Sequence, residues 1–378
     1  DKTYAAEHAI NGMYYDNLEH LGYAVPESFG LKNFKNTADI EINILRWWQH
    51  RIFRNSGVSA DGTEIYLDTD WLTSLQSTAY SDRITWIENA YEFIDQPGEW
   101  YLNRSESKLY YKPDGSMDGK SATLPVTEQL LVFEGTENIT FDGVKFEDTS
   151  WLTPNEIGYN DAQSGTYAQH NGVWGDVPGA IETHAAKNIT ITNSELRNLG
   201  IGGIRIGNGS SDCAITNSAI HDISSSGIFI GNNTGHNHGY CDPGTDVTGV
   251  VVRNNYITRT GLDIFGSSAI CALYTSDTVI DHNEVCYTTY TGISLGWGWD
   301  WKNAPCSGNN TVSNNYIHDT GKTIHDGGSF YSLGLQEGTK VFGNYLHHHS
   351  DGLYDKDGGL YTDEGSTGME LYNNVVGD

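Results

Sequence analysis

The sequence predicts an all-β protein, with a right-handed parallel β-helix preceded by a mostly β accessory domain. Three observations support this prediction. A two-part repeat, Asn-Asn/Ser-x-Ile followed by Gly-Ile-x-Ile-Gly, recurs through the C-terminal half. The chain contains 44 glycines and 23 tyrosines, which is typical of many tight turns and aromatic surfaces. Residues before 123 lack the repeat but contain other strand-like alternations.

The first part of the repeat carries one apolar anchor in each unit. Neighbouring anchors are 24 to 37 residues apart, and the shortest interval, from Leu196 to Ile220, sets the length of a bare coil. Repeats of this length predict a solenoid, in which each unit packs mainly on its neighbours. The anchors are Leu196, Ile220, Ile257, Val285, Ile317, Leu346 and Val376.

The second part of the repeat predicts one short strand in each unit. Alternating β-branched residues bounded by glycine and asparagine favour a strand-based coil over leucine-rich or helical repeats. Asparagines at the same corner of successive coils are expected to hydrogen-bond to one another and to accept left-handed backbone angles. The strand segments are GGIRIG (202–207), SGIFIG (226–231), SAICAL (268–273), TGISLG (291–296), GSFYSL (328–333) and GLYTDE (359–364).

We divide the chain into an accessory domain, residues 1–122, and a β-helix domain, residues 123–378. The accessory domain contains a predicted helix from Thr3 to Leu21 and a predicted β-hairpin within residues 99–113. Extra residues in a solenoid emerge as loops on one face, where function concentrates. Such insertions are predicted near 151–180, 232–248, 297–309 and 346–358.

The charge of the chain excludes several classes of partner. A formal net charge of −28 repels nucleic acid and anionic lipid. The sequence contains no run of about 18 apolar residues, so it predicts no membrane-spanning helix. The aromatic, acidic, lysine-poor composition resembles that of secreted polysaccharide-degrading enzymes, so we expect an extracellular protein. Because the chain opens at Asp1 without a leader, we expect a processed or trimmed product. Five cysteines without CxxC spacing indicate buried thiols with at most one disulfide.

Acidic residues cluster on consecutive predicted coils, at Asp300 in GWGWDW, Asp326 in IHDGGSF and Asp363-Glu364 in LYTDEGS. Stacked strands lie about 4.8 Å apart, so matched carboxylates lie about 5 Å apart on adjacent coils and about 9–10 Å apart two coils away. These separations are those of retaining and inverting glycosidases. Two such carboxylates supply one acid and one base or nucleophile. A bend is required to bring Asp326 and Asp363 together.

Aromatic and histidine side chains beside these acids are candidates for binding substrate. Trp297, Trp299 and Trp301 alternate, so in an extended segment they face the same way and form a flat surface for sugar rings. His348, within a run of three histidines, is expected to line the cleft near Asp363. The remaining candidates from the same motifs are Asp300, His325, Tyr331 and Tyr361.

No catalytic metal or cofactor is predicted. The HNHGYCD segment (236–242) lacks a second pair of zinc-like ligands, and we interpret it as a loop. Asp351, Asp355 and Asp357 fail the spacing of an EF-hand, so a solvated acidic loop is the default there, and a structural calcium ion remains an open alternative.

Five segments occur together in one order: 95–115 (DQPGEWYLNRSESKLYYKPDG), 143–154 (GVKFEDTSWLTP), 292–299 (GISLGWGW), 325–334 (HDGGSFYSLG) and 359–366 (GLYTDEGS). In this order they resemble bacterial β-helix enzymes of glycoside hydrolase family 141, over roughly Asp39 to Asp378. The resemblance implies a sandwich-like domain beside the helix and α-L-fucosidase or xylanase activity. It places the acid and base on Asp326 and Asp363, with Glu364 as a rival, and implies further sequence at both ends.

We therefore predict a glycoside hydrolase that acts on a neutral plant cell-wall polysaccharide, either xylan-type or fucosylated. The first alternative is a β-helix polysaccharide lyase, which requires cationic groups near a uronate; only eight Lys and Arg lie beyond Asn188. The second is a glycan-binding or structural solenoid in which the acids only cap turns. The sequence leaves the oligomeric state open.

Overall fold

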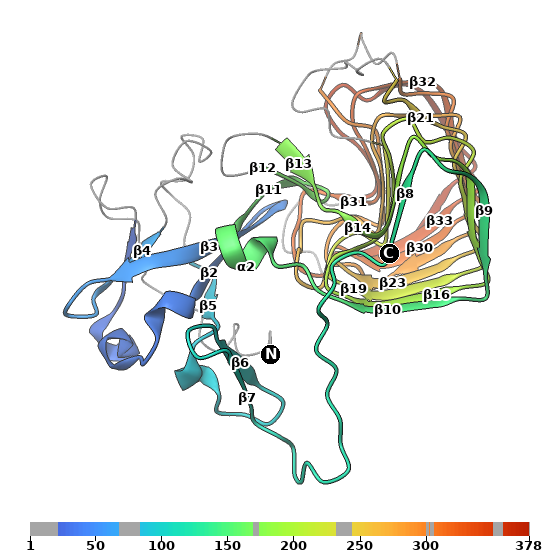
Figure 1. The fold of residues 1–378 in the computed structure, drawn as a ribbon. Coiled ribbons are helices and arrows are strands. Elements are labelled where there is room, and N and C mark those ends of the chain that lie inside the picture. Colours follow the sequence, from blue (N-terminus) through green and yellow to red (C-terminus); the bar gives the residue numbers. More distant parts are fainter. Residues whose placement is uncertain are drawn as a thin grey trace.

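The computed structural model describes residues 22–67, 84–168, 174–231, 244–299, 302, 306–350 and 358–377. The predicted helix from Thr3 to Leu21 lies outside these residues. The described chain forms an N-terminal sheet and a β-helix of three sheets, which lie beside each other (Figure 1). Nowhere in the described residues is a helix both long and apolar enough to cross a membrane.

The predicted β-helix is confirmed as three parallel eight-stranded sheets, and each coil gives one strand to every sheet. Sheet I consists of β8 (Leu131–Glu134), β14 (Gly179–His184), β17 (Gly202–Gly207), β20 (Ile228–Ile230), β24 (Ile270–Ala272), β28 (Ile293–Leu295), β31 (Gly328–Ser332) and β34 (Gly358–Thr362). Sheet II consists of β9 (Glu137–Asp142), β15 (Lys187–Thr192), β18 (Ala214–Thr216), β22 (Val251–Arg253), β26 (Val279–Asp281), β29 (Thr311–Ser313), β32 (Leu335–Phe342) and β35 (Thr367–Tyr372). Sheet III consists of β10 (Lys145–Thr149), β16 (Glu195–Leu199), β19 (Ala219–Ile223), β23 (Tyr256–Thr260), β27 (Glu284–Cys286), β30 (Tyr316–Thr320), β33 (Tyr345–His349) and β36 (Val375–Val376). A further short pair is β21 (Val247–Thr248) with β25 (Thr275–Ser276).

The two parts of the repeat occupy two of these sheets. The predicted anchors are register partners along sheet III, from Leu196 with Ile220 to Leu346 with Val376. The Gly-Ile-x-Ile-Gly segments form the last six strands of sheet I. Their inward side chains, with those of sheet II, stack into one continuous apolar core. Stacking like residues on like residues buries each coil's apolar face against the next coil.

The asparagine corner behaves as predicted, with two positions in different roles. The first position adopts a left-handed backbone, with φ of 56° at Asn254 and 53° at Asn314. The second stacks: the Asn283 amide donates to Asn315 at 3.0 Å, and the Asn315 amide donates to Asn344 at 2.9 Å. Because these amides are buried and mutually satisfied, the ladder fixes the corner without any ligand.

The N-terminal sheet is antiparallel and has its own apolar core. The insertion predicted near 151–180 belongs to it: this segment forms a short helix and three strands, of which β11 pairs with β3. The strands of the N-terminal sheet are β1 (Gly22–Ala24), β2 (Glu41–Arg46), β3 (Gln49–Val58), β4 (Glu64–Leu67), β5 (Trp86–Glu88), β11 (Tyr159–Gln163), β12 (Thr166–Ala168) and β13 (Trp174–Asp176). The helices are η1 (Glu27–Phe29), η2 (Leu31–Asn33), η3 (Thr37–Asp39), η6 (Tyr91–Phe93) and α2 (Thr153–Ile157).

Of two other predicted segments, one is confirmed and one is wrong at its start. The predicted hairpin is confirmed as β6 (Trp100–Asn103) paired with β7 (Lys108–Tyr111). The insertion predicted at 346–358 is wrong at its start, because residues 346–349 belong to β33 and pair with β30. Residues 351–357, with the three aspartates of the open calcium alternative, lie outside the described part of the chain.

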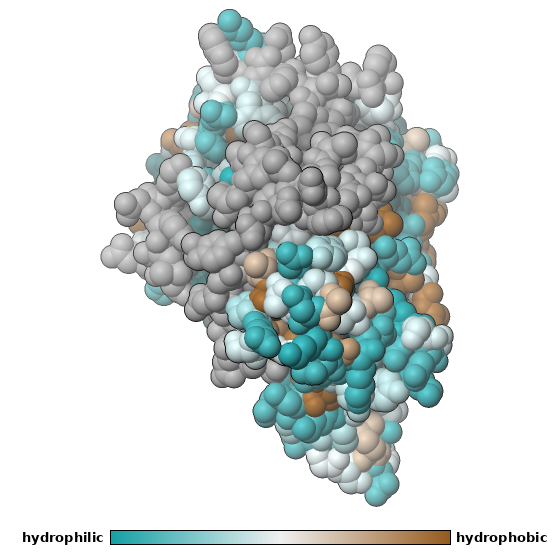
Figure 2. Space-filling model, turned by 90° about the vertical axis from the view of Figure 1, so that its left-hand side faces the viewer, coloured by the Kyte–Doolittle hydropathy of each residue, from teal (hydrophilic) through white to brown (hydrophobic). Residues whose placement is uncertain are grey.

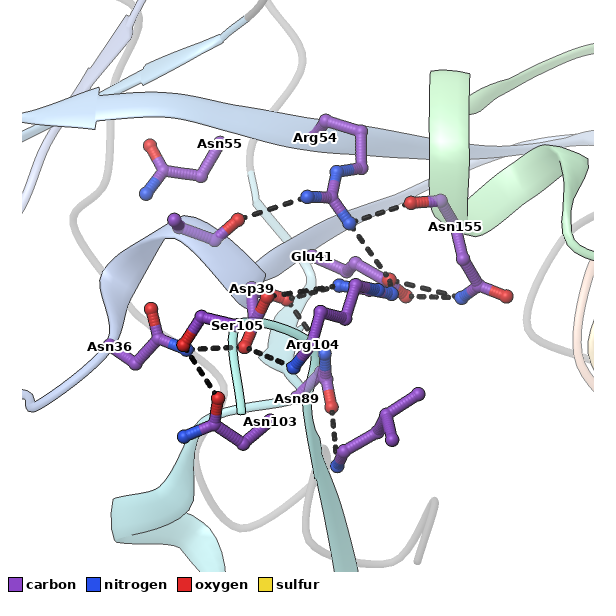
Figure 3. Close-up of polar contacts among 12 residues, drawn as sticks. Asn36, Asp39, Glu41, Arg54, Asn55, Asn89, Asn103, Arg104, Ser105 and Asn155 are labelled. Atoms are coloured by element: carbon purple, nitrogen blue, oxygen red, sulfur yellow. Dashed lines mark hydrogen bonds and ion pairs between the residues drawn. The ribbon is translucent and has the colours of Figure 1, made fainter. Parts of the chain in front are cut away.

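A buried charged cluster ties the β6–β7 hairpin and α2 to the N-terminal sheet (Figure 3). Arg104, in the hairpin turn, contacts Glu41 at 2.7 Å and Asp39 at 3.5 Å. Arg54 on β3 lies 3.6 Å from Glu41 and donates to the carbonyl of Asn155 at 2.6 Å. Two carboxylates that are almost fully buried are thus balanced by two guanidinium groups, as buried charges require.

The face of the molecule that carries the N-terminal sheet shows mostly hydrophilic described residues, with small apolar patches scattered among them (Figure 2). In the view of Figure 1, β11, β12 and β13 form the side of this sheet that lies next to sheet I of the β-helix. The outer face of sheet I is therefore where the two parts of the chain meet.

Candidate functional site

Asp326 and Asp363 lie on adjacent coils, beside two paired strands of sheet I. Asp326 precedes β31 and has a left-handed φ of 61°. Asp363 follows β34, and its backbone N–H donates to the carbonyl of Ser332 at 3.0 Å. Tyr331 and Tyr361 are register partners on these strands. The two acids therefore occupy opposite ends of the strand pair.

Each of these carboxylates is held by the tyrosine of the other coil. The Tyr361 hydroxyl donates to Oδ1 of Asp326 at 2.9 Å. The Tyr331 hydroxyl donates to Oδ2 of Asp363 at 2.5 Å. The two rings meet edge to face, with centroids 5.3 Å apart and planes at 86°. The two hydrogen bonds and the contact between the tyrosine rings therefore connect the two acids, although the acids lie at opposite ends of the strands.

The Tyr331 hydroxyl keeps its proton and donates a hydrogen bond to Asp363. Its side chain is 1% exposed. Burial, followed by the neighbouring Tyr290 and Asp363, raises the pKa of Tyr331 well above its ordinary value. The hydroxyl therefore stays protonated and fixes the position of the Asp363 carboxylate.

A second layer of contacts comes from the N-terminal sheet. Gln163, at the end of β11, donates from Nε2 to the hydroxyls of Tyr331 at 3.0 Å and Tyr290 at 3.3 Å. The Tyr290 hydroxyl in turn donates to the carbonyl of Asp326 at 2.9 Å. One amide from the insertion near 151–180 thus links the supports of both acids. Sequence reasoning missed both residues: Gln163 lies in the insertion predicted near 151–180, whereas Tyr290 lies one residue before the predicted strand segment 291–296.

The predicted flat tryptophan surface is wrong for the described pair. Trp297 is 2% exposed and packs with Tyr331 and Cys271 on the outer face of sheet I. Its ring lies at 62° to that of Trp299, which is half-buried. Gly298 between them has a φ of 83°, so the segment is not extended and alternate residues do not share a face. Asp300 and Trp301 lie outside the described residues.

A buried carboxyl lies two residues from Gln163 on the same strand. Asp161 is 2% exposed; its Oδ2 accepts the backbone N–H of His50 at 3.1 Å, and its Oδ1 accepts the Tyr159 hydroxyl at 3.3 Å. Burial raises the pKa of Asp161 to about 8, against an ordinary value of 3.8. This acid carries a proton at neutral pH at the junction between the two parts of the chain.

Comparisons with known proteins agree with this architecture. The family model described as "Right handed beta helix region" matches residues 179–376, more than half of the chain. The chain belongs to this right-handed β-helix family. No curated protein sequence gave a significant match.

One solved structure extends the likeness of this β-helix protein to its N-terminal sheet. A structure described as "Glycoside hydrolase" superposes with a TM-score of 0.82 at 24% identity, covering 97% of this chain and 72% of the other. A structure described as a complex of XylC with xylose covers 96% of this chain and 63% of the other, with a TM-score of 0.41 at 12% identity. At these identities the first match establishes a shared fold across nearly the whole chain.

The β-helix does not bring every predicted residue to the two acids. His325 lies beside Asp326, and its backbone N–H donates to the carbonyl of Trp47 at 2.8 Å. Glu364 is exposed, and its backbone carbonyl accepts the N–H of Gly334 at 3.1 Å. His348 lies on β33 in sheet III, with its Nδ1 2.8 Å from that of His347. Among the described residues, no hydrogen bond joins Glu364 or His348 to either acid.

The candidate acids form no metal-ligand cluster with other side chains in the described residues. The group of metal-ligating type found there lies on sheet III, away from the acids, and consists of Glu284, Cys286 and His318. Of the described cysteines, Cys306 is disulfide-bonded, whereas Cys213, Cys271 and Cys286 are free and buried. The sequence expectation of buried thiols therefore holds for these three.

Proposed function

We propose that this protein hydrolyses glycosidic bonds with Asp326 and Asp363 as its two catalytic carboxylates. The observation that carries the proposal is their crossed support: each acid is held by the tyrosine of the neighbouring coil, at 2.9 Å and 2.5 Å. Turn-capping aspartates require no such phenols. The shared fold with a solved structure described as a glycoside hydrolase supports the same conclusion.

The contacts suggest separate roles for the two acids. Tyr331 occupies Oδ2 of Asp363, whereas Oδ1 has no hydrogen-bond partner among the described residues. That oxygen is available to attack the anomeric carbon or to activate a water molecule. We assign Asp363 as nucleophile or base, and Asp326 as the acid that protonates the leaving oxygen. Glu364 is exposed and lacks a comparable support, so we place it outside the reaction.

The charges around the acids support a neutral glycan as substrate. A lyase neutralises a uronate with a cation, but the side chains that hold the two acids are phenols and an amide. Arg205, on the same sheet, is already paired with Asp176 at 2.7 Å and Glu182 at 2.6 Å. Within the proposal we include a xylan-type or fucosylated plant polysaccharide, membership of glycoside hydrolase family 141, extracellular location and catalysis without a cofactor.

Leaving-group dependence tests the two roles separately. Asp326→Asn should lower kcat/KM on a polysaccharide by about 10²–10⁴-fold, the usual contribution of a general acid. The same variant should retain much more activity on aryl xylosides and aryl fucosides, because their phenolate leaving groups need little protonation. Asp363→Asn should lose activity on both substrate types, and small anions such as azide should restore part of it in Asp363→Ala.

Asp277→Asn is a matched control, because Asp277 is exposed and also has a left-handed backbone, with φ of 53°. It should retain full activity. Circular dichroism must show that each variant keeps its β-sheet spectrum. If both Asn variants hydrolyse polysaccharide at the control rate, the assignment is wrong. Release of unsaturated products, followed by absorbance, would instead identify a lyase, and glycan binding without turnover would identify a binding solenoid.

A further inference from the structure

Sheet III carries a side-chain cluster that the proposed reaction does not use. Glu284 and Cys286 on β27 and His318 on β30 place one carboxylate oxygen, Sγ and one ring nitrogen all within 4.8 Å of one another. Cys286 is fully buried and forms no disulfide, whereas the side chain of Glu284 is 45% exposed. The cluster is therefore closed on the side of the coil and open toward solvent.

His318 lies between two carboxylates, with one at each ring nitrogen. Its Nδ1 lies 2.8 Å from Oδ2 of Asp319, which can only accept when ionised, so Nδ1 carries the hydrogen. Its Nε2 faces Glu284 and lies 3.4 Å from Oε1. A charge-assisted N–H···O contact is usually about 2.7–2.9 Å, shorter than this distance.

The distance between these two ligand atoms fits a bridging cation. Zinc binds imidazole nitrogen and carboxylate oxygen at about 2.0–2.2 Å, so two such ligands at a tetrahedral angle lie about 3.3–3.5 Å apart. The observed separation between Nε2 of His318 and Oε1 of Glu284 is 3.4 Å. The Asp319–His318 contact also reproduces the carboxylate that commonly orients a metal-bound histidine.

An earlier coil of the same sheet supplies an internal comparison. His221 contacts Asp222 at 2.7 Å through Nδ1 and Glu195 at 3.2 Å through Nε2, which repeats the arrangement at His318. There, Arg197 is the register partner of His221 and lies 3.9 Å from Glu195. At the later coil, the equivalent partner of His318 is Cys286. The position that carries the positively charged Arg197 beside His221 thus carries Cys286, a potential metal ligand, beside His318.

We propose that Glu284, Cys286 and His318 bind a divalent cation of the zinc class, with one coordination position open to solvent. The Sγ of Cys286 lies 3.4 Å from Oγ1 of Thr258 and 3.8 Å from the hydroxyl of Tyr256, and both hydroxyls can rotate to donate to a thiolate. Thiolate, imidazole and carboxylate together favour zinc over calcium or magnesium. The ion links β27 to β30 and is separate from the glycan site.

Cobalt substitution in the full chain tests this site without measuring activity. After chelator treatment and dialysis, the protein should bind one Co²⁺ per chain, with a thiolate-to-cobalt charge-transfer band and tetrahedral ligand-field absorption. Zn²⁺ should abolish both signals by displacement. Cys286→Ser should remove the charge-transfer band, and Glu284→Gln, at an exposed position, should weaken binding by at least about 100-fold. Asp319→Asn should weaken binding by about 10–100-fold.

His221→Gln is the matched control and should leave the cobalt spectrum and affinity unchanged. His348→Gln distinguishes adventitious binding at the exposed histidines of β33, where the Nδ1 atoms of His347 and His348 lie 2.8 Å apart. The proposal is overturned if the wild-type protein shows no thiolate band. It is equally overturned if the stoichiometry survives both Cys286→Ser and Glu284→Gln, or if His348→Gln is the change that abolishes binding.

Discussion

Replacing Asp161 by Asn should change how the stability of the protein depends on pH. The carboxyl is 2% exposed and lies on β11, against the backbone N–H of His50. Gly266 packs so closely over it that an added Cβ would lie 1.6 Å from Oδ2. Asn has nearly the same shape and keeps an acceptor oxygen, so the substitution removes the titration while largely preserving the packing.

The sign and size of the effect follow from the pKa of Asp161. Burial raises it from 3.8 to about 8, so between these values the folded state holds a proton that the unfolded state has released. The contribution of Asp161 to the free energy of unfolding is fully present below about pH 4 and is lost as the pH rises through about 8. Each pH unit costs about 1.36 kcal/mol, and about four units give an upper bound near 6 kcal/mol.

Urea unfolding followed by circular dichroism measures this directly. The unfolding free energy of Asp161→Asn minus that of the wild type should increase by about 1 kcal/mol per pH unit between about pH 5 and about pH 8. Subtraction removes the contribution of every other titrating group. Asp277→Asn, at an exposed site, should show no such trend. Parallel pH profiles for wild type and Asp161→Asn would refute the reasoning.

Three further substitutions test the supports of the site and the fold. Tyr331→Phe keeps the ring but removes the 2.5 Å contact to Asp363, so kcat should fall by about 10–100-fold with KM little changed, measured by steady-state kinetics. Arg104→Ala removes the 2.7 Å partner of buried Glu41 and should cost about 2 kcal/mol, measured by urea unfolding. Asn315→Ala interrupts the buried amide ladder and should cost about 1–3 kcal/mol, seen as a lower Tm in calorimetry.

The coil strands could be predicted from the sequence because their determinants are local and repeated. Leu196 and Ile220 recur in the same place in successive units, and stacking identical units places them in register, as observed. The same logic put Asp326 and Asp363 on adjacent coils. Their crossed tyrosines could not be predicted, because side-chain direction across a turn depends on backbone angles such as the left-handed φ at Asp326.

The part of the fold that escaped prediction depends on long-range pairing. Tyr159 on β11 pairs with Ile52 on β3, and a local alternation pattern contains no information about so distant a partner. The tryptophan prediction failed for a local reason instead. It assumed an extended strand through Trp297 and Trp299, whereas the φ of 83° at Gly298 interrupts it. Glycine between aromatic residues was the available signal, since glycine adopts left-handed angles readily.

The confinement of the candidate site to the last coils follows from what covers sheet I. Along its outer face, Phe229, Cys271 and Ser294 succeed one another in register and are all at most 3% exposed. These three outer-face positions are therefore closed to solvent. At the strand pair of β31 and β34, the half-buried Tyr361 follows the buried Tyr331. The insertion near 151–180, which packs against the earlier coils, also provides Gln163. The Gln163 side chain donates to the hydroxyl of Tyr331, which in turn holds Asp363.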